Sequence, residues 1–440
     1  MRQVLVFLGV MLLLHLKAAA QERPAYLDPT LPIEVRVEDL LGRMTLEEKV
    51  AQMLSMWQTK RLIVDEQNRF DPSRAPEWFK IGIGRIERPS EYFQTAREAA
   101  VFTNAIQRWV KENTRLGIPV LFHEEALHGI QASEATSYPQ AIALASTWNP
   151  ALVEQVYARI AREVRARGVH QVLTPVVDVG REPRWGRIEE TFGEDPFLVA
   201  EMGKAAVWGL QGRQVPPVGP GHVIATLKHM TGHGQPESGI NVAPVFFGER
   251  HLREVFLYPF REAIEKAGAL SVMASYNEID GIPSHVNAWM LRKVLRQEWG
   301  FQGTIVSDWF AIRQLITKHH VAADEAEAAQ RALAATVDIE LPDYDVYPVL
   351  LEQVRRGVVP EAAIDAAVRR LLWAKFAVGL FDGAPYVDPE EAERVNASEE
   401  DRALALEAAR QAIILLKNDG ILPLEAGRLD RVAVIGPHAG

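Results

Sequence analysis

The chain has 440 residues, 48% of them hydrophobic and 24% charged, which is the composition of a globular protein and excludes extended disorder. The formal net charge is −10 and no basic run is interleaved with aromatic residues, so nucleic acid is not an expected partner. There is no cysteine, which excludes disulfides, thiolate nucleophiles and Cys-ligated metal sites.

Residues 1–20 are typical of an export signal. Arg2 supplies the charged start, residues 4–14 are continuously apolar, and 18–20 are three alanines that form a small-residue cleavage site. The apolar core is too short to span a bilayer, and no later run approaches the required length. We therefore expect an exported protein, periplasmic or secreted, with no membrane association once the signal is removed.

Strand-like and helix-like patterns alternate along most of the chain. A helical pattern covers 39–56, with a capping turn at Thr45, and helical segments such as 150–167 and 252–267 separate the later strands. The strand-like segments are 81–86, 118–122, 172–179, 222–227, 270–275, 304–306 and 337–341. This alternation predicts an α/β fold with a parallel sheet, and the missing glycine-rich dinucleotide fingerprint favours a closed (β/α)8-type TIM barrel, although no eighth strand is evident.

The C-terminal part predicts a change of domain. A helix at 361–381 is expected to close a barrel domain that covers 21–381. The region 382–428 is expected to hold an exposed acidic linker at 388–400 and a second helix at 403–416. The run 431–436 reads as a first strand, so 429–440 would be the start of a second, α/β sandwich domain. A lone edge strand builds no core, so this strand would need the rest of such a domain.

Polar or charged side chains follow five neighbouring strands of the predicted sheet. They are Glu125, Arg187, Lys228 with His229, Tyr276, and Asp308 with Trp309. The carboxyl ends of parallel strands meet at one mouth, so these groups are expected to lie together in an active site. Asp308 read alone could cap the next helix, whereas Trp309 offers a flat apolar face for a sugar ring. His123, Glu124 and His128 do not form a helical metal-binding motif, and no metal is expected there.

Several motifs, in the order in which they occur, resemble those of a known family. The sequence RWGRIEE at 184–190, GEDP at 193–196, KH at 228–229 and SDW at 307–309 together resemble glycoside hydrolase family 3. The resemblance extends from about residue 32 to 440. The sequence GHGQPESG at 232–239 is similar to that of the bacterial β-glucosidase and β-xylosidase members.

The resemblance implies a role for each residue at the predicted mouth. Asp308 matches the nucleophile, Lys228 and His229 match a pair that binds hydroxyls of the terminal sugar, Arg187 matches an arginine that holds another hydroxyl, Glu125 matches an acidic residue at the far side of the ring, and Tyr276 and Trp309 match contacts around the subsite. Glu189, Glu190, Glu194 and Asp195 would order the loop around Arg187. Lys228 and Arg187 are expected to keep Asp308 ionised by lowering its pKa.

The implied activity is that of a retaining exo-β-glycosidase. It would release terminal non-reducing β-D-glucosyl or β-D-xylosyl residues from plant oligosaccharides or glucosides through a covalent glycosyl-enzyme on Asp308, with no metal or organic cofactor. Many family glucosidases carry Asp where this chain has Glu125. The longer side chain would intrude where a C5 hydroxymethyl group sits, which favours xylose without excluding glucose. The sequence leaves the oligomeric state open.

The acid/base residue is not assigned. Two-domain members take it from the domain after the barrel, and another branch carries an Asp-Ser/Thr-His loop where this chain reads ESGI at 237–240. We therefore expect it in the second domain. The alternatives are a β-N-acetylhexosaminidase or glycoside phosphorylase of the same family, and a non-catalytic sugar-binding barrel.

Overall fold

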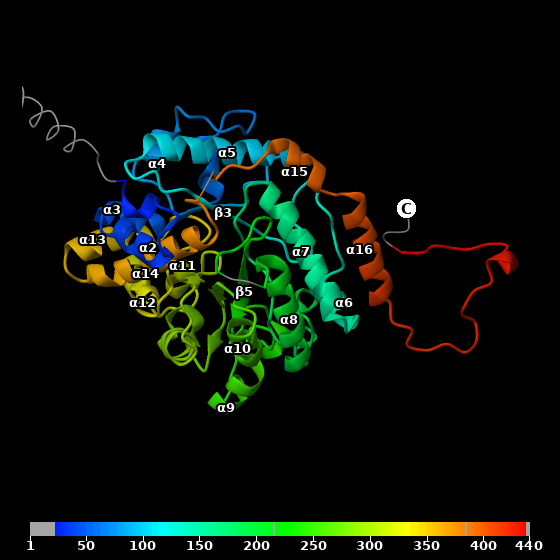
Figure 1. Ribbon diagram of the computed structural model, residues 1–440. Coiled ribbons are helices and arrows are strands. Elements are labelled where there is room, and N and C mark those ends of the chain that lie inside the picture. The colour runs from blue at the N-terminus through cyan, green and yellow to red at the C-terminus, as the bar shows by residue number, and fades with distance from the viewer. Residues whose placement is uncertain (1–22, 214–215, 383–384, 437–440) are drawn as a thin grey trace, which may run out of the picture.

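The computed structural model describes residues 23–213, 216–382 and 385–436, so the predicted export signal at 1–20 lies outside the described residues. Its centre is a seven-stranded parallel sheet with the strand order β1-β2-β3-β4-β5-β6-β9 (Figure 1). The strands are β1 (Ser55–Met56), β2 (Arg85–Glu87), β3 (Leu121–Glu124), β4 (Gln171–Val172), β5 (Ile224–Met230), β6 (Ser271–Ala274) and β9 (Thr304–Val306), and β7 (Glu278–Ile279) pairs with β8 (Ile282–Pro283) in a separate hairpin. Each predicted segment from 81–86 to 304–306 overlaps one strand of the sheet.

The segment 337–341 closes the sheet into a barrel. Ile339 forms a parallel bridge with Val306 of β9, and the Asp338 N–H donates to the Ile305 carbonyl at 2.8 Å. On its other side, the Glu340 N–H donates to the carbonyl of Met53, near β1, at 3.2 Å. The expected barrel is therefore confirmed. The eighth position that the sequence did not reveal is β1, which is only two residues long and lies inside an apparently helical pattern.

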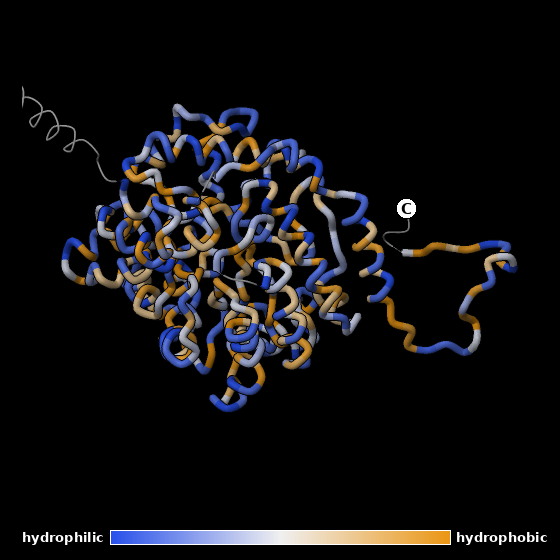
Figure 2. Tube along the Cα trace, viewed as in Figure 1, coloured by the Kyte–Doolittle hydropathy of each residue, from blue (hydrophilic) through white to orange (hydrophobic). Residues whose placement is uncertain are grey.

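Helices connect successive strands and surround the sheet (Figure 1). They are α2 (Ile33–Leu41), α3 (Leu46–Gln52), α4 (Ala75–Phe79), α5 (Ala96–Asn113), α6 (Ala141–Ser146), α7 (Pro150–Ala166), α8 (Pro196–Gln211), α9 (Glu249–His251), α10 (Tyr258–Glu265), α11 (Ala311–Thr317), α12 (Glu325–Ala334), α13 (Leu350–Arg355), α14 (Glu361–Ala377), α15 (Pro389–Val395) and α16 (Glu399–Ala412). π-helical turns cover Leu252–Phe256 and Trp289–Glu298. The buried apolar residues form one large continuous core, and Figure 2 shows many blue, hydrophilic residues on the outer helices and loops.

The expectation of one helix over 39–56 is wrong. The chain forms α2, breaks at Gly42, and starts α3 after Thr45, whose side chain accepts from the Glu48 N–H while Glu48 bonds back to the Thr45 N–H. This capping box satisfies the free amides at a helix start, so it marks a boundary inside an otherwise periodic stretch. The predicted capping turn is therefore confirmed, and the helix before it is separate.

The expectation of an exposed acidic linker over 388–400 is also wrong, because this stretch forms α15 and the start of α16. α15 packs against α5 and α7, and α16 packs against α6 and α7. The predicted helix at 403–416 is α16, which ends at Ala412 because the chain then becomes extended.

The segment 413–436 leaves the barrel as an extended chain (Figure 1). The strand predicted at 431–436 is not formed, and Val432, Val434 and Ile435 are 69%, 76% and 92% exposed. Figure 2 shows apolar stretches along this segment. A strand needs a partner for its backbone groups, and none lies beside this one in the described chain. No described helix combines the length and apolar character needed to cross a membrane.

Candidate active site

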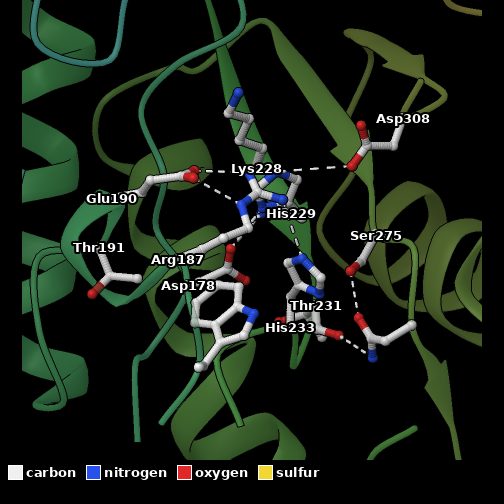
Figure 3. Close-up of polar contacts among 12 residues, drawn as sticks. Asp178, Arg187, Glu190, Thr191, Lys228, His229, Thr231, His233, Ser275 and Asp308 are labelled. Atoms are coloured by element: carbon white, nitrogen blue, oxygen red, sulfur yellow. Dashed lines mark hydrogen bonds and ion pairs between the residues drawn. The ribbon is translucent and has the colours of Figure 1, made fainter. Parts of the chain in front are cut away.

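The structure brings the predicted site residues together at the carboxyl end of the barrel, and Figure 3 shows four of them: Arg187, Lys228, His229 and Asp308. Lys228 and His229 lie within β5, Asp308 follows β9, and Glu125 directly follows β3. Figure 3 shows Arg187 lying between Glu190 and His229, with Asp308 on the other side of His229. These side chains come from β5, from the segments after β3 and β9, and from the loop at 187–190, and only the closed sheet makes them neighbours.

Asp308 is held so that one carboxylate oxygen is free. Its Oδ1 accepts the Trp309 N–H at 2.8 Å, and its own N–H donates to His285 Nε2 at 3.0 Å. Its Oδ2 has no hydrogen-bond partner among the described residues and lies 3.8 Å from His229 Nε2. The capping alternative is wrong, because α11 begins at Ala311 without a side-chain cap.

Burial raises the pKa of Asp308 to about 6, although Arg187 and Lys228 both act to lower it. The expectation of a net lowered pKa is therefore wrong, while the two cations have the expected effect. The residue is only 5% exposed, and the loss of hydration for a buried carboxylate exceeds the attraction of the two neighbouring cations. The cations keep Asp308 ionised at neutral pH, but with a small margin.

His229 is oriented by Asp178, a residue that the sequence analysis did not single out. Asp178 Oδ2 lies 2.8 Å from His229 Nδ1 and accepts the His229 backbone N–H at 3.0 Å. Burial raises the pKa of Asp178 to about 7, and burial followed by the charge of Arg187 lowers the pKa of His229. A carboxylate near the end of the apolar run 172–179 was the available signal, because such a run rarely contains one unless it is paired.

Arg187 lies in the loop after β4 and is fixed by two carboxylate contacts and two histidines. Its Nε and Nη2 donate to Glu190 at 2.8 and 2.7 Å, its Nη2 lies 3.0 Å from His229 Nε2, and its Nη1 lies 3.3 Å from His233 Nε2. When Asp178 accepts a hydrogen bond from the protonated Nδ1 of His229, the other ring nitrogen, Nε2, presents a lone pair to the guanidinium of Arg187. Asp195 caps α8 through the Leu198 N–H. The expected role of ordering the loop around Arg187 is thus confirmed for Glu190, whereas Asp195 caps the helix that follows the loop.

A glycine fixes the approach of this loop to β5. The Gly234 carbonyl accepts the N–H groups of Arg181 and Glu182 at 3.0 and 3.2 Å. A Cβ on Gly234 would lie 2.5 Å from the Val179 carbonyl oxygen, so a larger residue would push the two loops apart. The GHG sequence therefore helps to place the loop that carries Arg187.

Glu125 and Lys228 form an ion pair in the wall of a cavity. Lys228 Nζ lies 2.9 and 3.2 Å from the two Glu125 oxygens, and Lys228 is 3% exposed. The cavity has a volume of about 330 Å³, large enough for a monosaccharide, and it also touches Arg187. Asp308 does not itself line this cavity, which agrees with its low exposure.

An aromatic pair borders Asp308. The Trp309 and Trp57 rings lie 4.4 Å apart between centroids at 45°, and the Tyr276 hydroxyl donates to the Trp309 carbonyl at 2.9 Å. Burial, and then the charge of Asp308, raises the pKa of Tyr276. Trp57 follows β1, and the sequence analysis missed it because it did not recognise that strand.

The residues considered as metal ligands, His123, Glu124 and His128, lie beside three separate groups. His123 Nε2 is 3.2 Å from Glu87, Glu124 accepts the Ser90 N–H at 2.8 Å, and His128 Nδ1 lies 3.1 Å from the Tyr138 carbonyl. Among the residues that the structure describes, no group of three or more His, Asp or Glu side chains is arranged to hold a metal ion.

The sequence is similar to known glycosidases. Residues 45–374 match the model of the glycosyl hydrolase family 3 N-terminal domain. A putative β-xylosidase of Formosa agariphila is 38% identical over 94% of this chain and 54% of its own length. A periplasmic β-glucosidase of Salmonella typhimurium is 35% identical over 92% of this chain and 50% of its own length.

Solved structures agree. A β-glucosidase from Erythrobacter marinus superposes with a TM-score of 0.86 and 40% identity, over 92% of this chain and 53% of that one. A β-glucosidase from Listeria innocua in complex with glucose gives a TM-score of 0.77 and 32% identity, over 89% of this chain and 53% of that one. The chain thus spans about half the length of these relatives. With its barrel, its site and these similarities, it belongs to glycoside hydrolase family 3.

Proposed function

We propose that the protein is a retaining exo-β-glycosidase that releases terminal β-D-xylosyl or β-D-glucosyl residues from small oligosaccharides or glycosides. The observation that carries this proposal is the state of Asp308, a buried carboxylate with one oxygen anchored by Trp309 and the other left free beside His229. A free carboxylate oxygen next to cations is what attack on an oxocarbenium-like centre requires.

The first chemical step would use Asp308 Oδ2. This oxygen bonds to C1 of the terminal sugar as the bond from C1 to the leaving oxygen breaks, and water later attacks C1 to release the sugar with retained configuration. Asp308 must be ionised to attack. Arg187 and Lys228 hold its pKa below the value that burial alone would produce.

The other mouth residues would bind hydroxyl groups. Lys228 and Glu125 already face each other across 2.9 Å, so a sugar hydroxyl can accept from the ammonium and donate to the carboxylate. Arg187 and His229 would hold hydroxyls nearer Asp308, and Trp309 and Tyr276 would border the ring. Closing the far side of the ring with Glu125 restricts the site to chain ends.

We propose that the acid/base lies in a second domain that starts within 429–440. Departure of a poor leaving group needs a proton donor roughly 5–5.5 Å from the nucleophile in a retaining enzyme. The 440-residue chain should therefore react with an activated aryl glycoside and fail with a disaccharide. Adding the following domain in trans, or as a longer chain, should restore disaccharide hydrolysis.

Export to the periplasm or the medium fits this substrate class, since plant oligosaccharides are met outside the cytoplasm. The support is the pattern of residues 1–20 and the periplasmic relative from Salmonella typhimurium. The proposed chemistry needs no metal or organic cofactor.

Glu125 is proposed to set the preference between xylose and glucose. Its carboxylate is tied to Lys228, so its extra methylene relative to Asp reaches into the space that a C5 hydroxymethyl group would need. Glu125→Asp should raise kcat/KM for an aryl glucoside relative to the matching xyloside by about tenfold, in the range that one methylene contributes to specificity. An unchanged ratio would remove this role from Glu125.

The central experiment is covalent trapping. The chain is incubated with 2,4-dinitrophenyl 2-deoxy-2-fluoro-β-D-xyloside or the matching glucoside, and the labelled peptide is identified by mass spectrometry. We expect the fluoro-sugar on Asp308. Label on another carboxylate would overturn the nucleophile assignment, and sugar binding without any label would favour a sugar-binding barrel.

A further inference from the structure

The nucleophile's backbone is held by a buried histidine that the proposed reaction does not itself use. His285 is 2% exposed, and its Nε2 accepts the Asp308 N–H at 3.0 Å. A side chain, in place of a neighbouring strand, thus satisfies this amide. Because a buried backbone N–H is nearly always paired, removing the acceptor would leave it without a partner or let the peptide move.

The chain brings His285 to this place through the β7–β8 hairpin. After β6 the chain passes Asn277, forms the hairpin, and returns so that the Ser284 N–H and hydroxyl both bond to the Asn277 carbonyl, at 3.1 and 2.8 Å. The short turn Ser284–Val286 then presents the imidazole to Asp308. The hairpin base is therefore closed by its own hydrogen bonds, and the position of the ring is set by β6.

The contacts determine the form of the imidazole. Nε2 must carry a lone pair to accept the Asp308 N–H, so a neutral ring carries its proton on Nδ1. Burial lowers the pKa of His285 to about 3, in agreement with a neutral ring. The nearby His319 is itself paired with Glu278 at 2.7 Å.

We propose that His285 is a positioning residue for the nucleophile. It fixes the Asp308 peptide while the Trp309 N–H holds Oδ1, and these two bonds together aim Oδ2 at the anomeric carbon. This inference rests on the proposed function of Asp308. Displacing a reacting atom by about 1 Å can cost about 10²-fold in rate, so one backbone anchor has a large effect on a short attack distance.

The test separates the contribution of the hydrogen-bond acceptor of His285 from that of its aromatic ring. His285→Phe keeps an aromatic ring of similar size without an acceptor, and His285→Gln supplies an acceptor oxygen without the ring. Labelling by the 2-fluoro-xyloside is followed over inhibitor concentration, which yields a rate constant and an apparent dissociation constant. We expect His285→Phe to label about 10–100-fold more slowly at unchanged apparent dissociation constant, and His285→Gln to stay within about threefold of the wild type.

A second buried histidine provides the matched control. His170 Nδ1 accepts the N–H of Phe122 in β3 at 3.2 Å and is equally buried, but it lies directly before β4, away from Asp308. His170→Phe should lower the melting temperature and leave the labelling rate constant unchanged. Near-UV circular dichroism and D-xylose titration by tryptophan fluorescence would show that the variants remain folded.

The outcomes are distinct. Equal labelling rates for His285→Phe and the wild type would overturn the positioning role, and so would equal slowing in both His285 variants, which would indicate packing alone. A wild-type chain that binds D-xylose but is not labelled at Asp308 would contradict the proposed function itself. Slowing in His285→Phe with recovery in His285→Gln supports the proposal.

Discussion

Two segments of this chain carry nearly the same strand pattern and have opposite structures. Residues 304–306 read Thr-Ile-Val and 432–435 read Val-Ala-Val-Ile, both rich in β-branched residues. The first is β9, fully buried between β6 and 337–341, and it delivers Asp308 to the mouth. The second is extended and exposed, with Ile435 92% exposed. The comparison shows that a segment with high β propensity forms a strand only where neighbouring segments supply backbone hydrogen-bond partners and apolar contacts.

The largest expected effect removes the carboxylate that β9 delivers. Asp308→Ala should slow aryl glycoside cleavage by about 10⁴-fold, because the covalent route is lost. Initial rates of dinitrophenol release measure it. Asp430→Ala, the same change beside the exposed segment, should leave the rate within twofold. Equal cleavage rates in the two variants would show that the carboxylate of Asp308 at the mouth of the barrel is not needed for the reaction.

The second test compares the apolar residues themselves. Ile305→Ala should lower the free energy of unfolding by about 2–5 kcal/mol, because it empties part of a packed barrel. Urea denaturation followed by tryptophan fluorescence measures this loss. A change below about 1 kcal/mol would contradict the tight packing inferred for β9.

The third test concerns the charge balance at the mouth. The pKa of Asp308 is raised to about 6 by burial, so the protonated, unreactive form grows below pH 6 and the labelling rate should fall tenfold per pH unit there. Lys228→Met removes a cation that lowers this pKa and leaves Glu125 without its partner. The pH below which the labelling rate falls, the acid limb of the profile, should therefore move up by about one pH unit.

The control for that profile is an exposed lysine. Lys266 lies on the surface at the end of α10, and Lys266→Met should leave the acid limb in place. A limb that stays at the same pH in Lys228→Met would mean that another group controls it.

The smallest expected effect completes the comparison. Ile435→Ala should change the free energy of unfolding of this chain by less than about 0.5 kcal/mol, because the side chain is already in water. The same urea titration measures it beside Ile305→Ala. A loss of more than 1 kcal/mol would mean that the segment packs on the barrel in solution.

Much of the site could be predicted from the sequence because the position of a residue relative to a strand can be read from the local chain. A polar residue at or just beyond the carboxyl end of a buried parallel strand must lie at the mouth of the barrel. Glu125 and Asp308 follow β3 and β9, and Lys228 lies in the last part of β5. The order and spacing of the family motifs then pointed to the same mouth. The residues that support these groups were not visible in this way.

Asp178 and His285 act on His229 and Asp308 from loops 51 and 23 residues away in sequence. Such pairings depend on how the barrel closes, and no periodicity encodes them.

The sequence by itself determined the alternation of strands and helices, and with it the set of side chains that reach the mouth, because hydrophobic period and strand polarity are properties of the local chain. Only the tertiary structure decided three things: that β1 and 337–341 complete the barrel, that 431–436 forms no strand, and that the pKa of Asp308 rises to about 6 instead of falling. Each depends on which groups surround a residue in space, since hydration, burial and hydrogen-bond partners are shared among distant parts of the chain.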